Sequence, residues 1–93
     1  MAKTALISIL CEDRTGLIAA ITGRLFDLGA NLGDTTFAVL GTGAEFTTVC
    51  EVPEDLSLGQ VEDELKDLAE LRDAKLTVSD FSFKPVHGPS GDR

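Results

Sequence analysis

Residues 5–11 are apolar at every position except Ser8. An unbroken apolar run of this length is typical of a strand that is buried on both faces of a sheet. We therefore expect this stretch to form a central strand.

The period of the pattern changes at Gly16, after which apolar residues recur every three or four positions. This spacing predicts an amphipathic helix that ends at Gly29, because glycine suits the left-handed conformation of a helix stop. Gly23 lies inside this helix at a cost of about 1 kcal/mol relative to alanine, which indicates close packing there against another element. The apolar positions are Leu17, Ile18, Ile21, Leu25 and Leu28.

Residues 31–40 and 45–52 are both rich in threonine, valine and phenylalanine, and a Gly-Thr-Gly sequence at 41–43 separates them. This composition predicts two strands joined as a hairpin. The first of the two begins with several polar residues, which favours a position at the edge of the sheet.

A second helix is predicted to start at Ser57, because Ser57 and Gln60 have the spacing of a capping box. Leu56 and Val61 flank this box as a hydrophobic staple. The many carboxylates of the helix are expected to face water.

Residues 75–83 alternate between apolar and polar positions, with a one-residue slip at Ser79 and Asp80 that predicts a β-bulge. The element order is then β-α-β-β-α-β. This order predicts a ferredoxin-like α+β fold, a two-layer sandwich with an antiparallel sheet in the order 4-1-3-2. Residues 1–83 are expected to form a single domain, and residues 84–93 a mobile tail.

The chain has 93 residues and a net charge of −8, from 8 basic and 16 acidic side chains. Its cations are spread along the sequence, so direct binding to nucleic acid or to an anionic membrane is not expected. No apolar segment approaches the roughly 20 residues that span a bilayer. The predicted topology places Cys11 and Cys50 at opposite ends of the sheet, so we expect free thiols in a cytoplasmic protein.

The junction between the first strand and the first helix, residues 10–18, is the candidate binding site. A helix N-terminus has unpaired backbone N–H groups and a partial positive charge, which together attract anionic groups. Arg14 adds a full charge beside it, Thr15 is the expected N-cap, and Gly16 leaves the backbone accessible. We predict that this loop holds a small anionic or zwitterionic molecule; the alternative is an ordinary strand-to-helix connection.

The predicted topology also puts this loop and Asn31 at opposite ends of the molecule, so one chain could not use both on one ligand. Two chains related by a two-fold axis could bring the loop of one beside the second strand of the other. An exposed edge strand and an uncovered sheet face with Leu6, Leu10 and Phe37 favour such association. We therefore expect a homodimer.

The sequence DRTGL at positions 13–17 resembles the D-R-P-G-L loop of the ACT domain, a small regulatory module of the same β-α-β-β-α-β order. The sequence GANL at 29–32 is similar to the family's G-x-N-I step, and the resemblance covers residues 5–83. Thr15 replaces the usual proline. Within the family the similarity leans toward free-standing members such as the glycine cleavage system repressor.

The resemblance implies a sensor that binds an amino acid or a similar small-molecule effector and modulates a partner, such as a regulated enzyme or a transcription factor. Asp13, Gly16, Leu17 and Ile18 would surround the ligand through backbone groups, and Asn31 would contribute from the second strand. No cofactor is implied. Because some ACT domains only dimerise, a module for dimerisation or protein contact without a ligand is an alternative.

An enzymatic alternative is an acylphosphatase, a class of the same length and topology that uses an arginine and an asparagine. Arg14 and Asn31 could imitate this pair, but the glycine-rich phosphate cradle is missing and the acidic neighbours of Arg14 would repel a phosphate. His87, the only histidine, lies in the tail, so a cysteine or serine nucleophile lacks a base in the fold. No catalytic residues are expected, and no ligand spacing indicates zinc.

Overall fold

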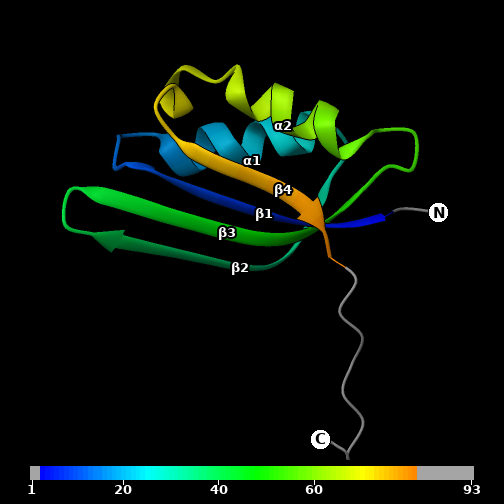
Figure 1. Ribbon diagram of the computed structural model, residues 1–93, viewed down its shortest axis with the longest axis horizontal. Helices are drawn as coiled ribbons and strands as arrows, with labels where there is room; N and C mark the ends of the chain where they lie inside the picture. The colour runs from blue at the N-terminus through cyan, green and yellow to red at the C-terminus, as the bar shows by residue number, and fades with distance from the viewer. Residues whose placement is uncertain (1–2, 82–93) are drawn as a thin grey trace, which may run out of the picture.

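The computed structural model describes residues 3–81, which form a four-stranded sheet and a layer of helices that covers one of its faces (Figure 1). The elements in chain order are β1 (Lys3–Glu12), α1 (Leu17–Asp27), β2 (Asn31–Leu40), β3 (Gly43–Val52), α2 (Leu58–Lys66), the short 3-10 helix η1 (Ala69–Leu71) and β4 (Lys75–Asp80). The predicted tail, residues 84–93, lies outside the described residues.

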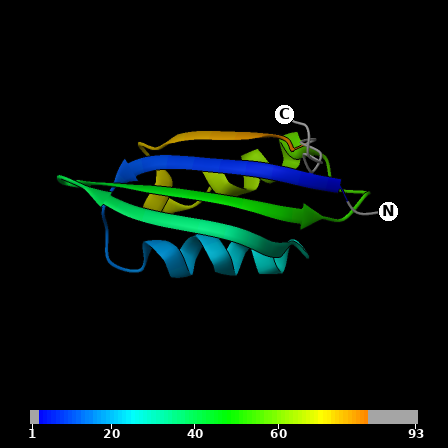
Figure 2. The same cartoon turned by 90° about the horizontal axis from the view of Figure 1, so that it is seen from below.

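The sheet has the order β2-β3-β1-β4 and is antiparallel at every pairing. This arrangement confirms the predicted order 4-1-3-2 and the ferredoxin-like fold. β2 lies at an edge and β1 in the interior, as predicted. In the helix layer, α1 lies toward β2 and α2 lies toward β4 (Figure 2).

The side chains of β1 alternate between the two faces of the sheet. Ala5, Ile7 and Ile9 are fully buried beneath the helices, whereas Leu10 points to the other face and is 44% exposed. The prediction that this strand is buried on both faces is therefore wrong, because both helices cover the same face. Leu6 lies with Leu10 on the uncovered face, as predicted.

The edge strand β2 contains a β-bulge. Its register against β3 shifts between Leu32 and Thr35, so that Gly33 and Asp34 together occupy the place of one residue. An extra residue reverses the alternation of side chains beyond it, and Phe37 consequently lies on the helix side, opposite the buried Phe46. The prediction that Phe37 lies on the uncovered face is wrong for this reason.

The bulge predicted at Ser79 and Asp80 does not form. β4 pairs with β1 without a register shift from Lys75 to Asp80, where the strand ends. The apolar positions that suggested the slip are Phe81 and Phe83. The Phe81 N–H donates to the Thr4 carbonyl at 3.0 Å, which continues the same register, and Phe83 lies outside the described residues.

The predicted capping box of α2 and the predicted glycine stop of α1 are both confirmed. Ser57 Oγ accepts a hydrogen bond from the N–H of Gln60 at 3.1 Å, and the Ser57 N–H donates to Gln60 Oε1 at 2.8 Å, which completes the capping box. At the end of α1, Gly29 has φ +84°, and the N–H of Ala30 donates to the Leu25 carbonyl at 2.9 Å. Together with the bond from the Gly29 N–H to the Phe26 carbonyl at 2.9 Å, this bond forms a Schellman motif. The helix therefore stops at the glycine, as predicted.

Cys11 and Cys50 are free and buried. The register pairs Cys50 with Ala5, six positions from Cys11 on β1, so the two cysteines lie apart as predicted. Burial raises the pKa of both thiols, and the Arg14 guanidinium partly offsets this effect at Cys11. Both thiols are therefore protonated core residues at neutral pH.

The bulge in β2 depends on a close contact that only glycine permits. A Cβ atom at Gly33 would lie 2.9 Å from the Val49 carbonyl oxygen. The hydroxyl of Thr35 donates to the Gly33 carbonyl at 3.0 Å and lies 2.8 Å from the hydroxyl of the fully buried Thr48. These bonds satisfy a buried polar group and hold the bulge in one conformation.

We expect Gly33→Ala to lower the free energy of unfolding by about 1–3 kcal/mol, because the new methyl group must displace the backbone of β3. Gly23→Ala is the matched control. A Cβ there meets no atom within 4 Å, so the predicted close packing at Gly23 is wrong and alanine should stabilise α1 by up to about 1 kcal/mol. Chemical denaturation measures both, and equal stability of the two variants would contradict this account of the bulge.

Candidate functional site

The loop after β1 ends in a glycine that starts α1. Gly16 is the N-cap residue, with φ +79° and ψ +7°, and no side chain accepts a hydrogen bond from the first turn of the helix. The prediction that Thr15 caps this helix is wrong, because the N-cap position has a left-handed conformation that glycine adopts without strain. A Cβ at Gly16 would meet no atom within 4 Å, so the helix start is open.

The first turn of α1 presents backbone donors to this open side. The N–H groups of Leu17 and Ala20 donate to carbonyls of the loop. Those of Ile18 and Ala19 lie between them, in positions that have no acceptor within a helix. With the positive end of the helix dipole, these two N–H groups favour a bound carboxylate or another small anion.

A cavity of about 250 Å³, here called the loop hollow, lies between this helix start and β2. It is lined by Asp13, Arg14, Gly16, Leu17, Ile18, Ala19 and Phe37. The structure thus brings together five of the seven predicted site residues. Thr15 and Asn31 do not line it.

Two lining residues, Ala19 and Phe37, were missed by the sequence prediction. Ala19 could have been found, because the third residue of a helix has an unpaired N–H group. Phe37 could not, because it reaches the helix side only through the reversal of side chains at the bulge.

The Arg14 side chain lines the loop hollow and also contacts residues near the end of the helix layer. Its Nη1 donates to the Glu70 carbonyl at 2.9 Å, and its Nη2 lies 3.1 Å from Glu12 Oε1 and 3.8 Å from Asp73 Oδ2. The side chain is only 17% exposed. We call this set of contacts the Arg14 clamp: it joins the first loop to η1, and the carboxylates of Glu12 and Asp73 offset the charge of the guanidinium.

Asn31 lies at the far end of the molecule from the loop hollow. It pairs with Glu51 and hence lies level with Thr4, near the start of β1, whereas the loop follows the end of that strand. Eight strand residues span about 26 Å. One chain therefore cannot bring Arg14 and Asn31 to one ligand, which removes the arginine–asparagine pair of an acylphosphatase.

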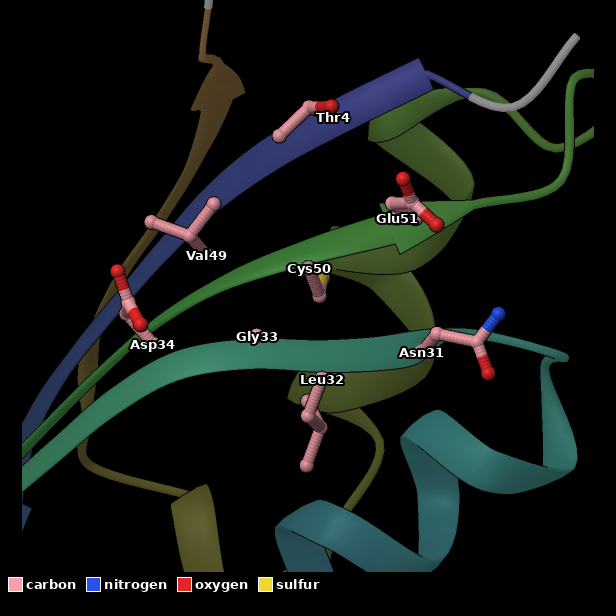
Figure 3. Close-up of a pocket in the computed structure, with 8 residues that line it drawn as sticks. All are labelled: Thr4, Asn31, Leu32, Gly33, Asp34, Val49, Cys50 and Glu51. Atoms are coloured by element: carbon pink, nitrogen blue, oxygen red, sulfur yellow. The ribbon is translucent and has the colours of Figure 1, made fainter.

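Asn31 lines a second cavity of about 360 Å³, here called the bulge hollow (Figure 3). It is lined by Thr4, Asn31, Leu32, Gly33, Asp34, Val49, Cys50 and Glu51. Figure 3 shows Glu51, Thr4 and Asp34 on the face of the sheet opposite the helices, with Cys50 and Leu32 pointing the other way. Its two carboxylates make this hollow acidic, so it does not suit an anion.

Exposed apolar side chains gather on α1 and β2. Among the described residues, six large apolar side chains are exposed, and five of them lie on these two neighbouring elements (Figure 2). They are Ile18 and Phe26 on α1, and Phe37, Val39 and Leu40 on β2. We call these five residues the α1–β2 flank; on β2, Phe37 and Val39 point to the helix side and Leu40 to the uncovered face. It includes the open edge of the sheet and borders the loop hollow.

Within residues 3–81, no group of three or more acidic, histidine or cysteine side chains is placed to hold a metal ion. No described helix is long and apolar enough to cross a bilayer.

The Arg14 clamp should contribute to stability. We expect Arg14→Gln to lower the free energy of unfolding by about 1 kcal/mol, because a charged donor to the Glu70 carbonyl is lost. Arg72→Gln is the control: within residues 3–81, the Arg72 side chain donates to the Ala69 carbonyl of its own segment alone, and its loss should cost less than about 0.5 kcal/mol. Urea denaturation measures both variants, and an equal loss of unfolding free energy in the two would show that the Arg14 clamp does not contribute to stability.

The chain is similar to known proteins in both sequence and fold. Residues 5–70 match the ACT domain family. A UPF0237 protein of Streptococcus mutans is 27% identical over 84 residues, which cover 89% of this chain and 96% of that protein.

Solved structures share the fold. An ACT domain protein from Streptococcus pneumoniae has a TM-score of 0.73 at 21% identity, covering 86% of this chain and 91% of that one. A structure described as a glycine cleavage system transcriptional repressor has a TM-score of 0.78 at 17% identity and covers 94% of this chain. The match covers 50% of the repressor, so the present chain spans about half of its length.

Proposed function

Because the chain belongs to the ACT domain family, a family of regulatory modules, we propose that it binds an amino acid in the loop hollow and acts as a homodimeric sensor. The loop hollow is the observation that carries this proposal. The bound amino acid would modulate a partner, such as a regulated enzyme or a transcription factor. Two buried, unpaired thiols support a reducing compartment such as the cytoplasm.

The lining of the loop hollow suits the two charges of an amino acid. The N–H groups of Ile18 and Ala19 favour the carboxylate. Asp13, whose side chain has no ion-pair partner among the described residues, provides a negative charge for the ammonium group. A neutral or purely anionic ligand would leave one of these features unused.

A second copy of the chain would complete this site. Two β2 edges that pair antiparallel around a two-fold axis place the start of one strand beside the end of the other. Asn31 of the partner subunit would then approach the end of β2, near Leu40 and the loop hollow. The α1–β2 flank, with its open strand edge and five exposed apolar side chains, supports this pairing.

The same flank supports a second candidate function, a module that dimerises without a ligand. The flank alone suffices for that role, whereas the sensor also needs the loop hollow to be occupied. Ligand binding and self-association must therefore be tested separately.

Ligand binding is tested by the thermal stability of the purified protein with each of the twenty amino acids. A ligand at 100 times its dissociation constant stabilises the folded state by about 2.7 kcal/mol, which raises the melting temperature of a domain of this size by several degrees. We expect Ala19→Glu to abolish the shift, because its carboxylate occupies the positive end of α1 and repels the ligand.

Gln60→Glu is the matched control, because it adds the same charge at the third residue of the other helix and preserves the capping box. It should retain the full shift. If no amino acid raises the melting temperature of the natural protein, the sensor proposal fails and the dimerisation module remains. A shift that survives in Ala19→Glu would move the binding site away from α1.

Self-association is tested by sedimentation velocity with charged substitutions. Val39→Lys should convert a dimer to a monomer, because a lysine on the strand edge places a charge where the partner's strand must pack. Thr77→Lys adds the same charge to β4 on the uncovered face and should remain dimeric. A monomer with Thr77→Lys but not with Val39→Lys would show that the sheets pair by their faces instead.

A further inference from the structure

We infer that the loop hollow selects an amino acid with an uncharged aliphatic side chain; this inference rests on the proposed function and narrows its ligand class. The sequence of the loop predicts a small anionic or zwitterionic molecule and does not distinguish between the two. The contacts of the structure favour the zwitterion with an uncharged side chain.

The one cation of the loop hollow is already engaged. Three oxygens surround the Arg14 guanidinium, from the Glu70 carbonyl at 2.9 Å and from the carboxylates of Glu12 and Asp73 at 3.1 and 3.8 Å. No other lysine or arginine of residues 3–81 lines the hollow. A second carboxylate on the ligand would therefore meet a guanidinium whose charge is already offset by two carboxylates.

The charge around the hollow also opposes an acidic side chain. Asp13 lines the hollow, and Glu12 and Asp73 lie on the Arg14 side chain at its border. These three carboxylates outnumber the single guanidinium, so the local charge is negative apart from the helix dipole. A single carboxylate can bind at the helix N–H groups, but a second one meets net repulsion.

The remaining lining is apolar. Leu17, Ile18, Ala19 and Phe37 supply aliphatic and aromatic surface, and Phe37 and Ile18 are 38% and 42% exposed in the free chain. An aliphatic ligand side chain would cover this surface and gain free energy from the burial. A cavity of about 250 Å³ is smaller than drug-sized pockets, and it suits a single small metabolite.

The test is isothermal titration of the natural protein with glycine, leucine and glutamate, which share a backbone and differ in their side chains. We expect leucine to bind at least about tenfold more tightly than glycine, because an apolar side chain is buried. Glutamate should bind at least about tenfold more weakly than leucine. Glutamate binding as tightly as leucine would overturn the inference and leave the sensor proposal standing.

Phe37→Ala tests the apolar wall directly. It should reduce the leucine-to-glycine affinity ratio to within about threefold and leave glycine binding unchanged, because glycine does not reach the wall. Val39→Ala is the control, since Val39 is equally part of the α1–β2 flank but does not line the hollow. A ratio that stays the same in Phe37→Ala would overturn the inference.

Asp13→Asn provides a second measurement. It should weaken leucine binding and narrow the difference between leucine and glutamate, because the carboxylate that holds the ammonium group also repels an acidic side chain. If the difference between the leucine and glutamate affinities is unchanged, Asp13 is excluded as the source of the selectivity against glutamate, and this part of the inference is overturned. Failure of all three amino acids to bind the natural protein would overturn this inference; the proposed function would fail with it only if none of the other seventeen amino acids raises the melting temperature.

Discussion

The pairing of β1 with a neighbour on each side is the constraint on which the rest of the molecule depends. Its antiparallel register with β3 and β4 directs Ala5, Ile7 and Ile9 to one face, where both helices pack. A slip of one residue would turn these side chains to the uncovered face and bring Leu6 and Leu10 beneath the helices. The end of the same strand delivers the first loop to the start of α1, so the core and the candidate site share one alignment.

Much of this fold follows from signals that act over a few residues. The capping box at Ser57, the glycine stop at Gly29 and the two-strand hairpin are each set by nearby chemistry, and their order restricts the topology to the observed sheet. The predictions that were wrong depend on contacts between residues far apart in the chain. Burial of β1 on one face depends on where the helices pack, and the bulge in β2 depends on a contact between Gly33 and the backbone of β3.

The candidate site likewise combines features set by neighbouring residues with features set by distant contacts. The glycine and the free N–H groups of the loop are local features, and the sequence predicts them. The position of Phe37 is not local, because the bulge several residues earlier decides which face it occupies. Gly33 therefore matters to a cavity that it does not touch: without the extra residue, the hollow would lose its aromatic wall. The engagement of Arg14 is also non-local, since its acceptor at Glu70 is 56 residues away in the chain.

The contacts of Arg14 with Glu12, Glu70 and Asp73 change the electrostatics of the whole site. A chain with a net charge of −8 disfavours anions generally, and an arginine free to bind them would be the natural way to overcome this. Here the arginine instead links the loop to η1, and the positive end of α1 is left as the attraction for a negative group. A helix end acts over about one turn and carries only about half a charge. It can hold one carboxylate when a compensating ammonium group lies beside Asp13, so the geometry favours a zwitterion over a free anion.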